Sequence, residues 1–142
     1  MIKNQERLGQ YINNIMNMKK KIETTDAPRA IGTYSQAITS GNMTFMSGQI
    51  PLDPQTMKLA QGEEDQIRQT FKNIVAVCQA SGATTNEIVK LNVYLSDLGV
   101  FEKVNEIMKE FFSEPYPARA AIQVSKLPLD SLIEIEGIIV HN

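Results

Sequence analysis

The sequence predicts an α+β domain of two layers, in which two helices pack on one face of a sheet. Apolar residues recur at helical spacing in two segments, residues 63–81 and 101–112. Several shorter segments instead alternate between apolar and polar residues, which is typical of strands with one buried face. The order along the chain is hairpin, helix, strand, helix, strand, strand. Each helix has one apolar stripe to bury, and one face of a sheet can bury both stripes. The helices and the sheet then form two layers.

The composition limits the chemistry that the chain can perform. The chain has 142 residues, enough for one domain, and a net charge of −2, which makes nucleic acid an unlikely partner. Its one cysteine, Cys78, and its one histidine, His141, cannot build a disulfide or a Cys/His zinc site. A serine–histidine–aspartate triad would have to use His141, near a chain end. We therefore expect no metal and no cofactor, and chemistry carried by Arg, Glu, Tyr, Asn and backbone groups.

Residues 1–17 differ from the rest of the chain. They are rich in Asn, Gln, Ile and Met, and their apolar residues from Leu8 to Met16 fall at helical spacing. A short amphipathic helix and an unstructured leader are equally favoured. Met18 precedes a natural domain start, so we expect an N-terminal extension over residues 1–17 and a single domain over residues 18–142. No apolar run approaches the length of a membrane span or a signal peptide, so the expected location is the cytoplasm.

The first half of the domain carries a hairpin and a helix. Residues 37–40 and 43–46 are strand-like and flank Gly41-Asn42, a two-residue turn signal. Residues 63–81 form the clearest helix. Its acidic first turn complements the helix dipole, and Gly82 follows as a C-terminal cap. Cys78 lies on the apolar stripe of this helix, and we interpret it as a core residue.

The second half carries a strand over residues 88–95, a helix over 101–112, and strands over 118–125 and 133–140. Alternation predicts that Val89 shares the buried face of the first strand with Leu91. The sheet face opposite the helices is predicted to be bare, and the two last strands give it Arg119 and Glu134 as polar residues. A bare, half-apolar sheet face indicates assembly with other chains.

Arg119 and Glu134 are the candidates for chemistry. A guanidinium fixed on a strand can hold a carboxylate with two hydrogen bonds, which suits substrate positioning. On position alone, however, a structural ion pair with Glu134 or Glu136 is favoured for Arg119. A glutamate within an apolar strand can orient water and act as an acid or base, but an exposed residue on the polar face is the favoured alternative.

Five segments together resemble the RidA (YjgF) family. They are DAPRAIGTYSQA at residues 26–37, SGQIP at 47–51, DLGVFEKVN at 97–105, PAR at 117–119 and IEIEG at 133–137. No single segment is specific, but five in register are. The resemblance implies a chorismate-mutase-like α+β fold with a mixed sheet, a homotrimer with clefts between subunits, and a reaction that needs no cofactor.

The resemblance also implies a function and a site. The function is hydrolysis of 2-imino and enamine acids, such as 2-iminobutanoate and 2-iminopropanoate, to 2-keto acids and ammonia. Arg119 is implied to hold the substrate carboxylate and Glu134 to orient water, in a pocket lined by Tyr34, Gly48, Asn105 and Ala121. Two departures from the family are Ala121, where many members have Cys, and Thr33, where many have Pro. The alternatives are binding of small carboxylates without turnover, in a regulatory or protein-stabilising role, and ribonuclease activity, which the charge disfavours.

Overall fold

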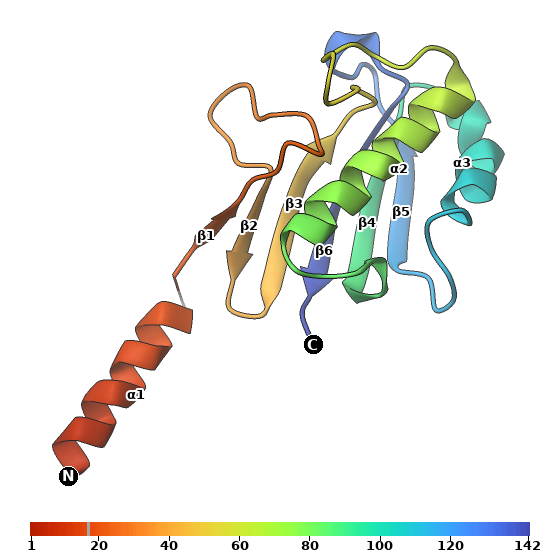
Figure 1. The fold of residues 1–142 in the computed structure, drawn as a ribbon. Helices are drawn as coiled ribbons and strands as arrows, with labels where there is room; N and C mark the ends of the chain where they lie inside the picture. Colours follow the sequence, from red (N-terminus) through yellow and green to blue (C-terminus); the bar gives the residue numbers. More distant parts are fainter. Residues whose placement is uncertain (17) are drawn as a thin grey trace.

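A computed structural model describes residues 1–16 and 18–142. Six strands form one sheet in the order β1-β2-β3-β6-β4-β5 (Figure 1). The strands are β1 (Lys20–Ile22), β2 (Ala37–Ser40), β3 (Met43–Gln49), β4 (Ile88–Leu95), β5 (Ala118–Gln123) and β6 (Ile133–Val140). Because β4 and β5 run parallel and all other neighbours antiparallel, the sheet is mixed.

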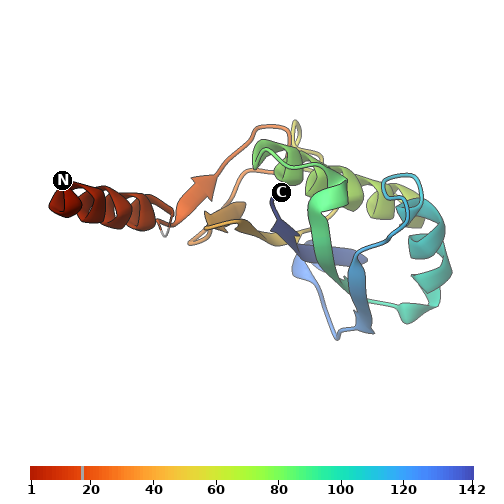
Figure 2. The ribbon, with the colours of Figure 1, turned by 90° about the horizontal axis from the view of Figure 1, so that it is seen from below.

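Two helices, α2 (Glu63–Ala80) and α3 (Phe101–Met108), cover one face of the sheet and leave the other face uncovered (Figures 1 and 2). The predicted two-layer α+β fold is therefore confirmed. The predicted hairpin is also present, since β2 and β3 pair around Gly41, whose φ of 60° lies in the left-handed region that glycine tolerates.

The core lies between α2, α3 and the sheet. Four residues of the predicted α2 stripe, Ile67, Phe71, Ile74 and Cys78, are fully buried in one cluster with inward-facing residues of β4 and β6. The fifth, Val75, is only partly buried, and Val77 is buried in its place. The largest completely buried apolar side chains are Phe71, Ile67, Ile74, Leu91, Leu95, Ile133, Ile135 and Ile139. Burying each one stabilises the fold by about 1.5–3 kcal/mol. Cys78 is buried among them as a free thiol, which confirms its interpretation as a core residue.

The structure differs from the prediction at a bulge in β4 and at several element ends, among them the ends of β5 at Gln123 and of α3. A bulge between Ile88 and Lys90 shifts the register of β4 against β6, so Ile88 is buried while Val89 is exposed. The prediction that Val89 faces the core is wrong, because one extra residue reverses the alternation of a strand. Helix α3 ends at Met108 instead of residue 112, although Phe112 still packs into the core from the following turn.

The N-terminal residues form a helix, α1 (Ile2–Met16), that projects away from the domain (Figures 1 and 2). None of its residues is buried. The hydrophobic core therefore contains no residue of α1, and the domain boundary near residue 18 stays a prediction.

Candidate functional site

Arg119 lies on the helix-covered side of the sheet. In the parallel pair of β4 and β5 it is registered with Leu91, a core residue, and it therefore faces α3. The prediction that Arg119 lies on the bare face is wrong. Alternation gave the two faces of this strand correctly but did not show which face the helices cover.

The guanidinium of Arg119 has no acidic partner within the described residues. It lies 5.2 Å from the ring centroid of Phe101, a cation–π contact, and Nη1 is 3.5 Å from Sδ of Met108. No ion pair with Glu134 or Glu136 exists in the described part of the chain, so the structural alternative for Arg119 is wrong there. The donors of a planar guanidinium remain available for a carboxylate.

A cavity of about 510 Å³ exposes this guanidinium. It is lined by Asn105, Glu106, Met108, Lys109, Tyr116, Pro117 and Arg119. Helix α3 supplies Asn105, and the segment before β5 supplies Tyr116 and Pro117. Arg119 and Asn105, both predicted to line the substrate pocket, thus share one cavity.

Glu134 lies on the opposite, uncovered side of the sheet. It pairs across the ladder with Tyr94, whose neighbours Val93 and Leu95 face the core. A second cavity, of about 570 Å³, brings it together with Tyr34 and Gly48. A Cβ built on Gly48 would lie 2.9 Å from Cδ of Glu134, so only glycine lets the carboxylate lie against β3 at this point.

The surroundings of Glu134 favour its neutral form. Burial and, to a smaller degree, the nearby charge of Glu136 raise the pKa of the Glu134 carboxyl. Glu136 lines the same cavity. Half-burial in a cavity together with a raised pKa is typical of a carboxyl group that transfers protons.

The predicted site residues therefore form two half-sites within one chain. The Glu134 half-site holds Tyr34, Gly48 and Glu134, and the Arg119 half-site holds Asn105 and Arg119, on opposite faces of the sheet. Ala121 lines neither cavity. It is paired with Val93 in the ladder next to Arg119 and is packed against the core.

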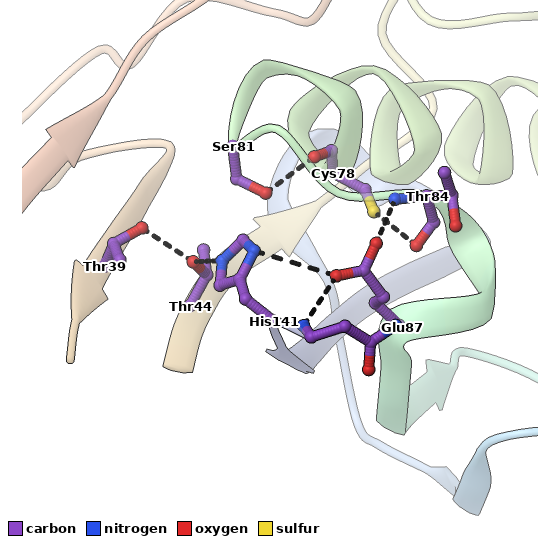
Figure 3. Close-up of polar contacts among 8 residues, drawn as sticks. Thr39, Thr44, Cys78, Ser81, Thr84, Glu87 and His141 are labelled. Carbon is purple, nitrogen blue, oxygen red and sulfur yellow. Dashed lines mark hydrogen bonds and ion pairs between the residues drawn. The ribbon is translucent and has the colours of Figure 1, made fainter. Parts of the chain in front are cut away.

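A second polar cluster has the connectivity of a catalytic triad (Figure 3). Nε2 of His141 lies 2.6 Å from Oγ1 of Thr44, and Nδ1 lies 4.0 Å from Oε2 of Glu87. Thr44 is completely buried, and a hydroxyl that no substrate can reach cannot act as a nucleophile. Backbone N–H groups of Thr84 and Asn142 also donate to Glu87, so the cluster ties the end of the chain to the sheet.

Cys78 lies beside this cluster and donates from Sγ to the carbonyl of Thr84 at 3.3 Å (Figure 3). Burial raises the pKa of the thiol to about 12, which keeps it protonated at neutral pH. A buried thiol in that state is a poor nucleophile. Within residues 1–16 and 18–142, no three acidic, His or Cys side chains gather in a way that could hold a metal ion. None of the described helices is long and apolar enough to cross a membrane.

The fold and the two cavities define a class of small α+β proteins with an arginine in one cavity and a half-buried glutamate in the other. A family model described as endoribonuclease L-PSP matches residues 24–141. The chain is 50% identical over 122 residues to a RutC family protein of Pyrococcus horikoshii, covering 85% of this chain and 97% of that protein. It is 41% identical over 126 residues to a 2-iminobutanoate/2-iminopropanoate deaminase of Dermatophagoides farinae, covering 88% and 98% of the two chains.

Solved structures agree with these matches. The crystal structure of RidA from the Antarctic bacterium Psychrobacter sp. superposes with a TM-score of 0.83 at 49% identity, covering 85% of this chain and 98% of that one. The structure of E. coli TdcF with bound serine has a TM-score of 0.84 at 43% identity, with coverages of 87% and 99%. The chain belongs to the RidA (YjgF) family, and the relatives named as deaminases indicate deamination of reactive intermediates.

Some residues that shape the cavities carried no distinct signal in the sequence. Phe101 and Met108 support Arg119 from α3, but in the sequence they are ordinary members of an apolar stripe. Arg29 lines the Glu134 cavity from the loop before β2. Tyr94 could have been found, since strand alternation already put it on the polar face of β4, where it meets Glu136.

Proposed function

We propose that the chain hydrolyses 2-imino and enamine acids, such as 2-iminobutanoate and 2-iminopropanoate, to 2-keto acids and ammonia. The observation that carries the proposal is the guanidinium of Arg119, which lines an open cavity and forms no ion pair with any residue that the structure describes. A carboxylate is the ligand for which its planar donors are best suited. The relative from Dermatophagoides farinae bears the name of this activity, and serine, bound in the TdcF structure, carries a carboxylate.

The complete site is proposed to form between two copies of the chain. Arg119 of one subunit faces a cavity on one side of the sheet, and Glu134 of a neighbour supplies the other half from the opposite side. An interface that joins two different surfaces of identical chains forms a ring where the rotation between neighbours closes, and a ring of three copies is the proposed homotrimer with three clefts. Exposed apolar side chains on the uncovered sheet face, among them Phe45 and Ile122, provide area for that contact.

The proposed reaction needs positioning and proton transfer. Arg119 fixes the substrate carboxylate, and Tyr34 and Asn105 line the pocket around the imine. Glu134 orients a water molecule toward the imine carbon. Water adds across the C=N bond, and the C–N bond then breaks to give the keto acid and ammonia. An imine is electrophilic without further activation, so orientation and acid–base assistance suffice.

The small imino acid is favoured over RNA as the substrate, although the matching family model is described as an endoribonuclease. The chain has a net charge of −2, and RNA binding depends on neutralising many phosphates with Lys and Arg. The second candidate function is binding of a small carboxylate without turnover, and the serine in the TdcF structure favours it as an alternative.

The experiment is to add the purified protein to a threonine or serine dehydratase reaction and follow keto-acid release. The proposal predicts faster release with the wild type and no acceleration with Arg119→Ala. Equal rates for this variant and the wild type would contradict the assignment of Arg119. Loss of rate with retained ligand affinity in Glu134→Gln would identify an enzyme, whereas a wild-type protein that binds a small carboxylate without accelerating keto-acid release would favour the binding alternative.

A further inference from the structure

A second carboxylate, Glu136, lies beside Glu134 and is held by two donors from β4. Oη of Tyr94 donates to Oε1 of Glu136 at 2.5 Å, and Nδ2 of Asn92 donates to the same oxygen at 3.3 Å. Such a short bond from a hydroxyl to an ionised carboxylate is among the stronger hydrogen bonds in proteins. Hydrogen bonds from Tyr94 and Asn92 therefore hold the Glu136 carboxylate in one position.

Glu134 has a different environment, although it is only two residues away on the same face of β6. Both carboxylates line the same cavity. In the described part of the chain, the carboxylate of Glu134 accepts no hydrogen bond, and Gly48, which has no Cβ, lies against it. Unlike surroundings can divide the acid and base roles between two neighbouring carboxyl groups.

The other charged or titratable groups near the pair are few. Lys90 lies on the same face of β4, because it is registered with Ile138. The loop before β2 supplies Arg29 and Tyr34 to the cavity, and β3 (Met43–Gln49) contains no titratable residue. Neither Lys90 nor Arg29 forms an ion pair with Glu134 or Glu136 in the described residues.

We propose that Glu136 is a positioning residue whose fixed negative charge makes Glu134 the proton carrier of the pair. This inference rests on the deaminase function proposed above. Glu136 touches neither substrate nor water in this scheme. It acts on the reaction only through Glu134, and Tyr94 and Asn92 keep its charge in place.

The electrostatics agree with this division of roles. After burial, the charge of Glu136 is the next cause that raises the pKa of the Glu134 carboxyl. The pKa of Tyr94 is raised to about 12, chiefly by its hydrogen bond to Glu136. The phenol of Tyr94 therefore stays protonated at neutral pH and remains a donor to Glu136.

The proton transfers balance with Glu134 alone as the carrier. As the water oxygen bonds to the imine carbon, Glu134 accepts a proton from the water and the C=N electron pair moves to nitrogen. Glu134 then returns this proton to the nitrogen, which gives a carbinolamine. In a second transfer, Glu134 takes the hydroxyl proton as the C=O bond forms and passes it to the nitrogen as the C–N bond breaks and ammonia leaves. Glu134 ends in its initial state, as a catalyst must, and Glu136 exchanges no proton.

The test compares Glu136→Gln and Glu136→Ala with the wild type. Titration of Glu134, followed by NMR in full-length protein carrying ¹³C-carboxyl-labelled glutamate and assigned with Glu134→Gln, should show a lower midpoint in both variants. The acid limb of the kcat/KM profile should shift to lower pH in the same two proteins. The matched control is Glu64→Gln, which makes the same substitution at an exposed residue of α2. It should shift neither the titration of Glu134 nor the kcat/KM profile.

An unchanged Glu134 midpoint in Glu136→Gln would overturn the inference. So would a normal pH profile in the Gln variant with impairment only in the Ala variant, because that pattern indicates a purely structural hydrogen bond. Failure of the deaminase function would give a different result, namely a wild-type protein that does not accelerate keto-acid release. The NMR titration decides the coupling between the two carboxylates in either case, since it does not depend on turnover.

Discussion

Arg119 and Glu134 lie on opposite faces of one sheet. Arg119 is registered with Leu91 of the core, whereas Glu134 is registered with Tyr94 of the uncovered face. The backbone layer of the sheet separates side chains that lie on its opposite faces. A single chain therefore cannot present both side chains to one small substrate. If both act on the same molecule, two copies of the chain must contribute.

Replacing Arg119 should abolish most of the activity without unfolding the protein. We expect Arg119→Lys to lose about 100-fold or more in kcat/KM, because an ammonium cannot form the paired hydrogen bonds that orient a carboxylate. Keto-acid release measures the rate, and circular dichroism checks the fold. Arg68→Ala is the control, since Arg68 pairs with Glu110 on the surface and should leave the rate unchanged. A fully active lysine variant would exclude paired hydrogen bonding.

Replacing Glu134 by Gln should lower kcat but raise the free energy of unfolding at pH 7. We expect kcat to fall by about 10²–10⁴-fold, the usual contribution of an acid–base group. The raised pKa of Glu134 means that the charged carboxylate destabilises the folded protein. The loss in free energy of unfolding is fully present above the folded-state pKa and absent below the ordinary glutamate pKa of about 4.3. Denaturant unfolding should therefore find Glu134→Gln more stable than the wild type at pH 7, with the gain vanishing in acid. A loss of stability at pH 7 would contradict this.

Adding one methyl group at Gly48 should impair the site locally. The new Cβ would lie 2.9 Å from Cδ of Glu134, so the carboxylate must move. We expect Gly48→Ala to lower kcat by at least about tenfold, because misplacing a reacting group by about 1 Å can cost 100-fold. A matched change, Gly62→Ala, meets no neighbouring atom, although the φ of 88° there adds backbone strain. Wild-type kcat in Gly48→Ala would show that Glu134 is not held against this glycine.

The triad-like cluster around His141 should be structural. Thr44→Val removes a buried hydroxyl that lies 2.6 Å from both Thr39 Oγ1 and His141 Nε2. We expect a loss of about 1 kcal/mol in the free energy of unfolding, with kcat/KM unchanged. Cys78→Ala should likewise retain activity. Loss of turnover in a folded Thr44→Val protein would identify a second catalytic centre.

Most of the fold followed from periodicity and turn chemistry. The α2 stripe and the alternation of β6 predicted the core, and Gly41-Asn42 predicted the hairpin. Pattern could not find the bulge at Val89, because a bulge depends on how two strands align and not on either strand alone. The three-residue strand β1 was missed for a similar reason, since its pairing with β2 is supplied by a distant segment.

The candidate site could be predicted from the sequence only in part. Pattern alone favoured an ion pair for Arg119, and only the five matching segments raised it above that alternative. Which sheet face receives Arg119 depends on the side where α3 packs, a property of the whole fold. The partner of Glu136, by contrast, could be anticipated, because Tyr94 already lay on the polar side of a neighbouring strand.

The most direct test of a site shared between two copies is to mix two inactive variants. Arg119→Ala retains a functional Glu134, and Glu134→Gln retains a functional Arg119. If the subunits are unfolded together at equal concentration and reassembled, about a quarter of the clefts between subunits should receive both intact residues by chance. A site shared between subunits predicts that the mixture regains about a quarter of wild-type keto-acid release, whereas a mixture as inactive as its two components would contradict a shared site.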